Sequence, residues 1–276
     1  MRVYPNFHAI PRHVKLPDNS AMQYFHIDTQ KSHVGFCRLQ YHNENRFYAC
    51  CRTGFHGPAR TSLLSDWIDV ASIFNGIMPN FVDFHKVTLD QVNAVFCPYW
   101  PAEATDWMTR ISVSGWPDKN LKDHIMRGGC HLVAKSHHTE PEDDTQWRYS
   151  FSQAEIILVN SWSDVQKYIY HILRVIKGRI TKKCNTPEQS IFNNYFFKTI
   201  MLWASEKKPV KFWNKESIDS SIAELLGQAI ECLIDRECQH YFISQVNILD
   251  EALESDMSKD ISSLEEHMCG KIQSTM

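Results

Sequence analysis

The chain has 276 residues and a mass of 32.2 kDa, with 43% hydrophobic and 12% aromatic residues. A chain of this size and composition can bury a full core, as one large domain or as two lobes, which excludes a disordered chain. The formal net charge of -3 and the pI near 6.5 exclude a globally basic nucleic-acid binder, although a local basic patch remains compatible with them.

The first 60 residues carry short β-branched and aromatic runs separated by Asn, Asp and Gly. Residues 22–28, 33–41 and 46–52 are predicted to be strands of a meander. His56-Gly57-Pro58 predicts a turn, and residues 65–74 predict a short helix with its apolar side chains on one face.

A further strand is predicted over residues 87–97, because VTLDQVNAVFC combines β-branched content with alternation. In this strand Asp90 is expected to point outward from an apolar sheet. An outward carboxylate is also what an ordinary solvent-exposed strand residue would show. Two Trp-Pro pairs then bracket a short predicted helix over residues 102–111. Another helix is predicted over residues 120–127, where Gly128-Gly129 ends it.

The run WRYSFSQAE, residues 147–155, sets an arginine, two serines and a glutamate among large apolar residues. Its first half alternates like a strand with one buried face, and Arg148 and Ser150 fall on the polar face. Ser152 followed by Glu155 predicts a capping box that opens a helix. An arginine beside a helix N-terminus suits a phosphate or a base, and the same pattern also fits a capped helix with a surface arginine.

The rest of the chain has helical periodicity. Helices are predicted over residues 152–159, 163–180, 187–206 and 217–237, which together form a bundle. In the third helix Tyr195, Lys198 and Thr199 share one face, where they could stack a base and touch a phosphate. An amphipathic helix with a packed tyrosine and a snorkelling lysine explains the same spacing.

The tail from Leu249 onward has apolar residues every three or four positions among charged ones. This predicts an amphipathic helix, which forms a short coiled-coil seam or packs back on the bundle.

The nine cysteines are odd in number, lack C-x-x-C spacing and follow no apolar signal segment. We therefore expect reduced thiols in a cytoplasmic or nuclear protein, and no apolar run predicts a membrane span. Cys50-Cys51, Cys130-His131 and His137-His138 lack ligand spacing, because neighbouring strand residues point to opposite faces. No zinc is predicted.

Seven motifs stand out from about residue 56 onward: HGP (56–58), DQVNAVFCPYWP (90–101), SGWP (114–117), GCHLVAK (129–135), WRYSFSQAE (147–155), NNYFFKTIMLW (193–203) and YFISQVNIL (241–249). In this order they resemble the Mab-21-like family, whose members include cyclic GMP-AMP synthase and related invertebrate receptors. The resemblance covers most of the chain, whereas any single motif would be weak.

The resemblance implies an α+β fold, in which a nucleotidyltransferase β-sheet lobe precedes an all-helical Mab-21-type lobe and nucleotide binds in the cleft between them. We place a partial nucleotidyltransferase lobe at residues 1–116, the helical lobe at residues 117–250 and a charged amphipathic tail at residues 251–276.

The resemblance also implies roles for single residues. Asp90 falls where the family carries its third metal-binding acidic residue, and it is the one catalytic residue and magnesium ligand predicted. Arg148 and Ser150 match positions that contact the base, and Tyr195 matches the base-stacking tyrosine. Arg174 and Asn194 stand where active relatives have a lysine and a serine on the triphosphate. The predicted nucleotide-binding set, with Lys198 added, is Arg148, Ser150, Arg174, Asn194, Tyr195 and Lys198.

Phosphoryl transfer in this family is implied to need a Gly-Ser loop and two further carboxylates that complete a two-magnesium site. The chain has no Gly-Ser pair, and Asp28, Asp66 and Asp69 lack the expected context. We therefore expect the chain to begin inside the catalytic lobe, as a natural pseudoenzyme or as a truncated gene model. Magnesium is expected only where the site is completed.

Two functions follow from these expectations. The first is a non-catalytic module with a residual cleft for ATP or GTP and an unidentified protein partner. The second is part of an innate immune receptor that makes cyclic dinucleotides on sensing double-stranded RNA, with Arg174, Lys177, Arg179, Lys182 and Lys183 on phosphates. That basic run also fits a solvated helix end. DNA sensing is not predicted, because no zinc-binding insertion lies between Arg148 and Tyr195.

Overall fold

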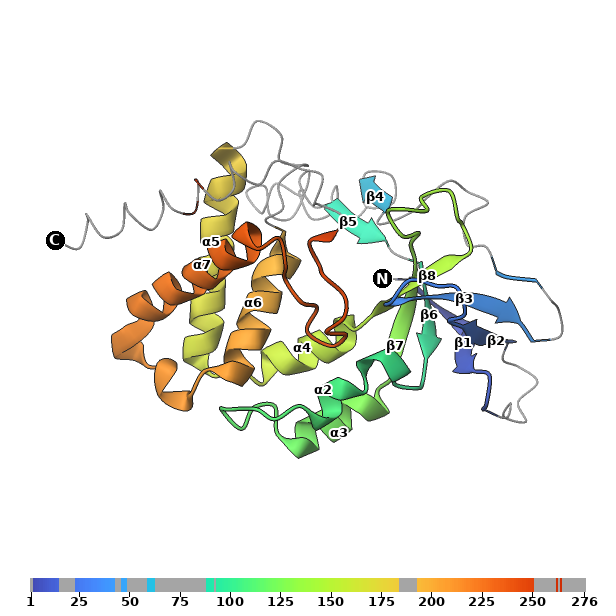
Figure 1. The fold of residues 1–276 in the computed structure, drawn as a ribbon, viewed down its shortest axis with the longest axis horizontal. Helices are drawn as coiled ribbons and strands as arrows, with labels where there is room; N and C mark the ends of the chain where they lie inside the picture. Colours follow the sequence, from blue (N-terminus) through green and yellow to red (C-terminus); the bar gives the residue numbers. More distant parts are fainter. Residues whose placement is uncertain are drawn as a thin grey trace, which may run out of the picture. The chain divides into compact units, whose positions relative to one another are not determined.

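The computed structural model describes residues 2–14, 23–42, 46–48, 59–62, 88–91, 93–183, 193–250, 262 and 264. The chain forms two compact units: Met1–Tyr99 with Gly129–Ser150, and Trp100–Gly128 with Phe151–Met276. Strands build the first unit and helices the second, which confirms the predicted α+β class (Figure 1). Residues Gly129–Ser150 belong to the sheet unit although they follow the first helices along the chain.

The main sheet has six strands: β1 (Arg2–Pro11), β2 (Gln23–Asp28), β3 (Phe36–Tyr41), β6 (Asn93–Cys97), β7 (Cys130–Ala134) and β8 (Gln146–Ser150). They are hydrogen-bonded in the order β1-β2-β3-β8-β7-β6, and the sheet closes because β1 also pairs with β6. Strand β1 is parallel to both of its neighbours, whereas the other four pairs are antiparallel.

One face of this sheet forms the core of the first unit. The side chains that alternate onto it are almost completely buried: Ala9, Phe25, Leu39, Val95, Leu132 and Trp147. Cross-strand register brings them together, since Ala9 is opposite Phe25 and Val95 is opposite Leu132. Each large apolar side chain buried in this way contributes about 1.5–3 kcal/mol relative to exposure.

The strands predicted over residues 22–28 and 33–41 are confirmed as β2 and β3. Residues 46–52 were expected to form another strand, but the described part of this segment contributes one isolated bridge, between Phe47 and Gln40. Residues 49–52, the turn predicted at 56–58 and the helix predicted at 65–74 lie outside the described residues.

The single strand predicted over residues 87–97 is wrong. Strand β5 (Thr88–Gln91) pairs with β4 (Ala59–Ser62) in a separate two-stranded sheet, and β6 begins at Asn93 in the main sheet. Both pieces are extended, so alternation continues through them and cannot reveal that the chain changes sheets. Asp90 therefore belongs to the small sheet and not to the main apolar one.

The helical unit begins with short elements. The helix predicted over residues 102–111 is a 3₁₀ turn, Ala102–Ala104, followed by α2 (Asp106–Thr109), and the chain is extended at Arg110. Helix α3 (Lys119–Arg127) ends as predicted, with Gly128 at its C-cap and Gly129 at a φ of +64°. A β-carbon on Gly129 would lie 2.2 Å from the Cys97 carbonyl oxygen, so this close approach requires glycine.

Four longer helices follow: α4 (Ser152–Asn160), α5 (Asp164–Lys183), α6 (Asn194–Lys207) and α7 (Ile218–Ile234). The last three pack on one another around fully buried Leu173, Met201 and Leu225, which confirms the predicted bundle. In the predicted tail the described residues are Ser262 and Leu264, both helical, and Leu264 is buried. None of the helices in the described ranges has the length and apolar character of a membrane span.

Candidate functional site

Strand β8 carries two of the predicted nucleotide-binding residues, Arg148 and Ser150. The alternation predicted for it is confirmed, because Trp147 and Tyr149 are buried while Arg148 is exposed and Ser150 is half-buried. The Trp147 ring stacks on Tyr48 with centroids 5.6 Å apart, and its Nε1–H donates to the Tyr48 carbonyl at 3.2 Å. The buried rings therefore fix the strand and leave Arg148 on its polar face.

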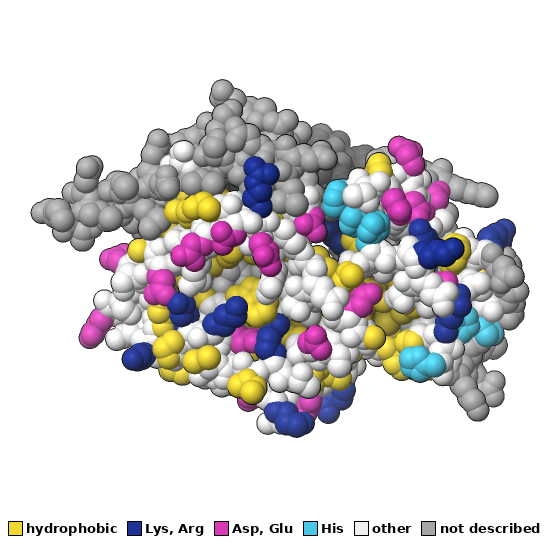
Figure 2. Space-filling model, viewed as in Figure 1, with side chains coloured by type: hydrophobic (Ala, Val, Ile, Leu, Met, Phe, Trp, Pro, Cys, Tyr) yellow, Lys and Arg dark blue, Asp and Glu magenta, His cyan; other side chains and the backbone are white. Residues whose placement is uncertain are grey.

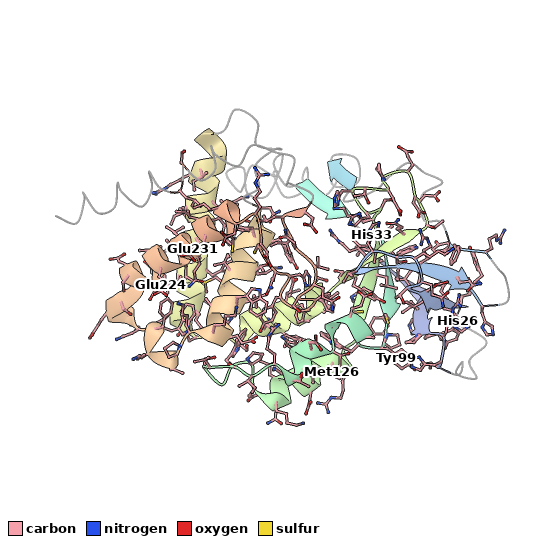
Figure 3. All side chains as sticks on the ribbon, in the orientation of Figure 1. His26, His33, Tyr99, Met126, Glu224 and Glu231 are labelled. Atoms are coloured by element: carbon pink, nitrogen blue, oxygen red, sulfur yellow. The ribbon has the colours of Figure 1, made fainter. Side chains whose placement is uncertain are left out.

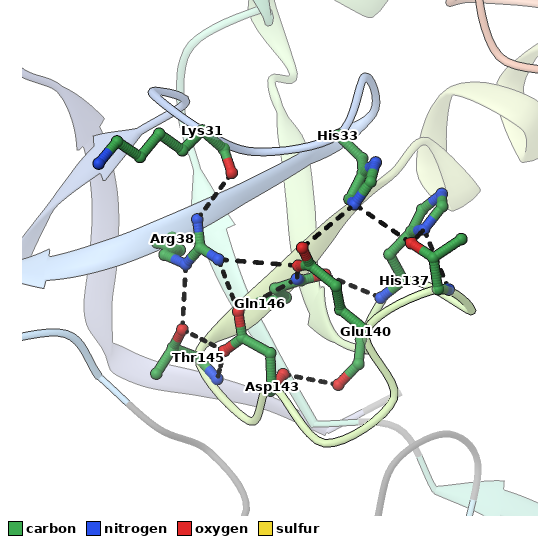
Figure 4. A network of polar contacts seen from close by, with 10 residues as sticks. Lys31, His33, Arg38, His137, Glu140, Asp143, Thr145 and Gln146 are labelled. Atoms are coloured by element: carbon green, nitrogen blue, oxygen red, sulfur yellow. Dashed lines mark hydrogen bonds and ion pairs between the residues drawn. The ribbon is translucent and has the colours of Figure 1, made fainter.

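A polar network holds the first residue of β8 (Figure 4). Gln146 is 2% exposed, and its Nε2–H donates to Asp143 at 3.1 Å and to Glu140. Arg38 donates to the same Asp143 carboxylate at 2.6 Å and to the Thr145 hydroxyl at 3.2 Å. Burial raises the pKa of Asp143, but hydrogen bonds from Thr145, Arg38 and Gln146 outweigh it and lower the pKa to about 2. The ionised carboxylate thus fixes the register of the strand that carries Arg148.

Two histidines pack beside this network, on the loops that precede β3 and β8. The His33 and His137 rings stack with centroids 3.7 Å apart and an interplanar angle of 9°. Both residues are labelled in Figure 4. Among the side chains that the structure describes, no three His, Cys, Asp or Glu residues are arranged to hold a metal ion.

The capping box predicted at the start of α4 is wrong. Phe151 occupies the N-cap position without a side-chain cap bond, and Ser152 is already the first helical residue. Phe151 is held by stacking on Phe242, with ring centroids 4.5 Å apart, so packing sets the helix start. Glu155 donates its N–H to the Phe151 carbonyl at 2.9 Å, and its carboxylate turns instead to an ion pair with Lys198 of α6.

That ion pair is the centre of a group we call the Glu155 cluster: Glu155, Tyr170, Arg174, Tyr195 and Lys198. The Lys198 ammonium lies 5.2 Å from the centre of the Tyr195 ring, and the Arg174 guanidinium lies 5.9 Å from the Tyr170 ring. Burial raises the pKa of Tyr170; the Arg174 charge opposes this shift and the Glu155 charge adds to it. Three of the predicted residues, Arg174, Tyr195 and Lys198, are thus brought to one cluster.

The N-terminus of α6 lies beside this cluster. Asn193 caps the helix, because its side-chain oxygen accepts the Phe196 N–H at 2.8 Å. Asn194, the fourth predicted residue of this unit, is exposed in the first turn. Thr199 is fully buried and donates to the Tyr195 carbonyl at 3.0 Å, so it does not share the polar face predicted for it.

Two family models match adjacent parts of the chain. Residues 81–161 match the Mab-21 protein nucleotidyltransferase domain, and residues 165–266 match the Mab-21 protein HhH/H2TH-like domain. The chain is a member of the Mab-21-like family. Strand β8 and helix α4 lie in the Mab-21 nucleotidyltransferase match. The HhH/H2TH-like match covers α6, α7 and all of α5 but its first residue. The order of domains that the motifs implied is confirmed.

Asp90 stands in β5 within the Mab-21 nucleotidyltransferase match, where the backbone register places Arg60 of β4 opposite it. A two-magnesium site needs further carboxylates beside Asp90, and the side chains of β4 and β5 lie outside the described ones. Magnesium binding at Asp90 therefore stays a prediction. The role predicted for Asp90, and its approach to Arg148 and Tyr195, stay predictions.

The structure describes part of the basic run predicted on α5. Arg174 and Arg179 are exposed and Lys177 is half-buried, whereas the side chains of residues 181–183 lie outside the described ones. The face drawn in Figure 2 presents acidic and basic side chains side by side over the helices. On that face the charge is mixed, as on a solvated helix surface.

Local spacing missed the polar partners that join distant segments of the Mab-21 chain. Glu155 and Lys198 are 43 positions apart, and Glu206 pairs with Arg110 across 96 positions. The available signal was a charged residue at an otherwise apolar helical position, which predicts a buried partner without identifying it.

Proposed function

We propose that this chain is a nucleotide-binding module of the Mab-21-like family that does not itself catalyse phosphoryl transfer. The observation that carries the proposal is the Glu155 cluster, which gathers Arg174, Tyr195 and Lys198 beside the N-terminus of α6. ATP or GTP is the proposed ligand. The module then serves as an interaction platform for a protein partner.

The chemistry of this cluster suits a nucleotide. The half-buried Tyr195 ring, tilted 40° to His240 at 6.0 Å, provides a surface on which a purine can stack. Lys198 offers an ammonium to a phosphate, although its ion pair with Glu155 offsets part of that charge, and Asn194 lies where the first backbone N–H groups of a helix favour an anion. An aromatic ring and a cation at this spacing bind base and phosphate together.

The other two residues of the predicted set, Arg148 and Ser150, belong to the sheet unit and are considered by themselves. Arg148 is exposed on the polar face of β8, and Ser150 follows on the same face. The family resemblance assigns both to the base, where a guanidinium forms charge-assisted hydrogen bonds. Their contribution is tested separately from that of α6.

The non-catalytic part of the proposal rests on what this sequence contains. It has no Gly-Ser pair, and Asp28, Asp66 and Asp69 lack the context expected of the other two metal ligands. A chain that lacks the phosphate loop and this acidic pair would hold a nucleotide without activating it.

The alternative is part of an innate immune receptor that makes cyclic dinucleotides from ATP and GTP on sensing double-stranded RNA. The exposed Arg174 and Arg179 of α5 favour it, since such cations contact phosphates. The formal net charge of -3 favours the binding module instead.

Titration calorimetry with ATP and with GTP tests nucleotide binding. Tyr195→Ala and Arg148→Ala are each expected to weaken binding about fivefold or more, since one stacked base or one charged contact contributes about 1–3 kcal/mol. Tyr168→Ala on α5, where the ring is 54% exposed, and Arg127→Ala on α3 are matched controls that should leave affinity unchanged. Unchanged affinity in both test variants would remove nucleotide binding from the proposal.

Incubation of the chain with ATP, GTP, magnesium and double-stranded RNA tests catalysis. We expect no cyclic dinucleotide by chromatography and mass spectrometry. Product that disappears on Asp90→Ala would show that this chain is an active nucleotidyltransferase and favour the receptor.

A further inference from the structure

Two cysteines meet where helix α7 ends. The helix stops at Ile234, and Arg236 then adopts a φ of +56°. The Glu237 N–H donates to the Cys232 carbonyl at 3.0 Å, and the Arg236 N–H donates to the Leu233 carbonyl at 3.3 Å. These two bonds form a Schellman motif, which turns the chain back on the last helical turn. Cys238, the next residue, is thereby brought against Cys232.

The two thiols are hydrogen-bonded to each other, and the backbone holds them in this position. The Cys238 N–H donates to the Asn247 side chain at 2.8 Å, and its carbonyl accepts the Ile248 N–H at 2.8 Å. With both backbone groups of Cys238 fixed, its thiol stays beside Cys232, and closeness of the two sulfurs is the first requirement of a disulfide.

Exposure and charge give the two sulfurs different roles. Cys232 is half-buried, whereas Cys238 is 3% exposed, so a small solute reaches Cys232 first. The hydrogen bond from Cys238 lowers the pKa of Cys232, although burial and the neighbouring carboxylates oppose it. One of these neighbours is Glu231, which Figure 3 labels on α7; the others are Asp235 and Glu237. The thiolate is the reactive form, so Cys232 is the attacking sulfur.

A second thiol pair in the chain provides a contrast. Cys97 and Cys130 are opposite each other in the β6–β7 ladder and donate to the Tyr99 carbonyl at 3.2 and 3.8 Å. They are 1% and 2% exposed, so solvent does not reach either sulfur. The two thiols are close together in both pairs, but only in the Cys232–Cys238 pair does solvent reach one of the sulfurs, that of Cys232.

We propose that Cys232 and Cys238 form a modification site, which a hydroperoxide converts reversibly into an intramolecular disulfide. The Cys232 sulfur attacks the peroxide, the O–O bond breaks, and an alcohol or water leaves, so that Cys232 becomes a sulfenic acid. The Cys238 sulfur then attacks the sulfenic sulfur; the S–O bond breaks, the S–S bond forms and water leaves. Two thiols are oxidised by two electrons, one hydroperoxide is reduced, and a thiol reductant reverses the change.

Peptide mapping of the full chain tests the site, because trypsin cleaves after Arg236, between the two cysteines. Residues 216–236 and 237–259 form the two tryptic peptides, which the disulfide would hold together. The native chain is treated with hydrogen peroxide, alkylated, digested without reductant and analysed by mass spectrometry. We expect the linked peptides before Cys97 or Cys130 is oxidised, and we expect dithiothreitol to separate them.

Two serine variants assign the order of attack. In Cys238→Ser the link is lost and dimedone labels the Cys232 sulfenic acid; in Cys232→Ser the link is lost and Cys238 stays a thiol. Circular dichroism at each peroxide dose confirms that the chain is folded. The proposal is overturned when Cys232 reacts no faster than Cys97, or when the rate of linking rises with protein concentration, which indicates a bond between two molecules.

Discussion

Glu206, near the end of α6, connects three segments of the helical unit. Its side chain is 2% exposed and accepts two hydrogen bonds from Arg110, one of them 2.9 Å from Nη2, and one from the Tyr241 hydroxyl at 2.7 Å. Burial, followed by the Glu206 charge, raises the pKa of Tyr241, so the phenol remains a donor. Arg110 also lies 4.1 Å from the centre of the Trp203 ring.

We expect Glu206→Ala to lower the free energy of unfolding by about 3–5 kcal/mol, because it leaves a buried cation and a buried hydroxyl without their acceptor. The Arg110 side chain is 21% exposed, so water replaces part of the loss and the lower half of this range is expected. Glu206→Gln keeps one acceptor oxygen and should cost about 1–3 kcal/mol.

Urea unfolding at pH 7, followed by tryptophan fluorescence, measures these differences. Glu224→Ala is the matched control: this residue, labelled on α7 in Figure 3, pairs with Lys208 and its side chain is 48% exposed. It should cost about 0–1 kcal/mol. The double variant Arg110→Met with Glu206→Leu removes both charges and should recover most of the stability lost in Glu206→Ala. Equal losses in Glu206→Ala and Glu224→Ala would refute the reasoning.

Three further changes test other parts of the molecule. Asp143 has a pKa of about 2 in the folded chain, below the ~3.9 of an unfolded carboxyl. The unfolded chain therefore binds more protons at low pH, and up to about 2 kcal/mol of the free energy of unfolding is lost as pH falls from about 4 to 2. Asp143→Asn should lose this slope in urea titrations, and an unchanged slope would assign it elsewhere. Gly129→Ala should lower the free energy of unfolding by more than about 2 kcal/mol, because the new carbon would lie 2.2 Å from the Cys97 carbonyl oxygen. Gly178→Ala, where α5 leaves open space, should raise it by about 0.5–1 kcal/mol. The reverse order would contradict the close approach at Gly129. Glu155→Gln removes the charge that neutralises Lys198, so ATP binding measured by calorimetry should become about twofold to fivefold tighter. Weaker binding would show instead that the ion pair positions the lysine for phosphate.

The elements that the sequence predicted correctly are those that bury one face and expose the other. Strand β8 alternates because Trp147 and Tyr149 pack inward while Arg148 faces away, and α5 and α7 keep a helical period because each presents one face to the bundle. Length also helped, since a period repeated over many residues separates helix from strand.

The missed features depend on contacts that local spacing does not contain. All five residues of β7 are buried, so the strand shows no alternation. The start of α4 follows the Phe151–Phe242 stack and not the Ser152 hydroxyl, and the partner of Glu155 lies on another helix. The sequence selected three residues of the Glu155 cluster, Arg174, Tyr195 and Lys198, but only the fold shows that Lys198 pairs with Glu155.

That neutralisation decides which part of a nucleotide the cluster should recognise. The described cluster has two cations, Arg174 and Lys198, against one carboxylate, Glu155, so the proposed triphosphate would meet one net positive charge. Stacking on Tyr195 is independent of this balance. We therefore expect ATP to bind no more than about tenfold more tightly than adenosine, a difference of ~1.4 kcal/mol, and both to weaken in Tyr195→Ala. Calorimetry at low and high salt separates the contribution of the phosphates from that of base stacking, because salt screening weakens phosphate contacts and leaves stacking nearly unchanged. A preference for ATP above about a hundredfold that disappears in high salt would mean that phosphate, and not the base, determines binding.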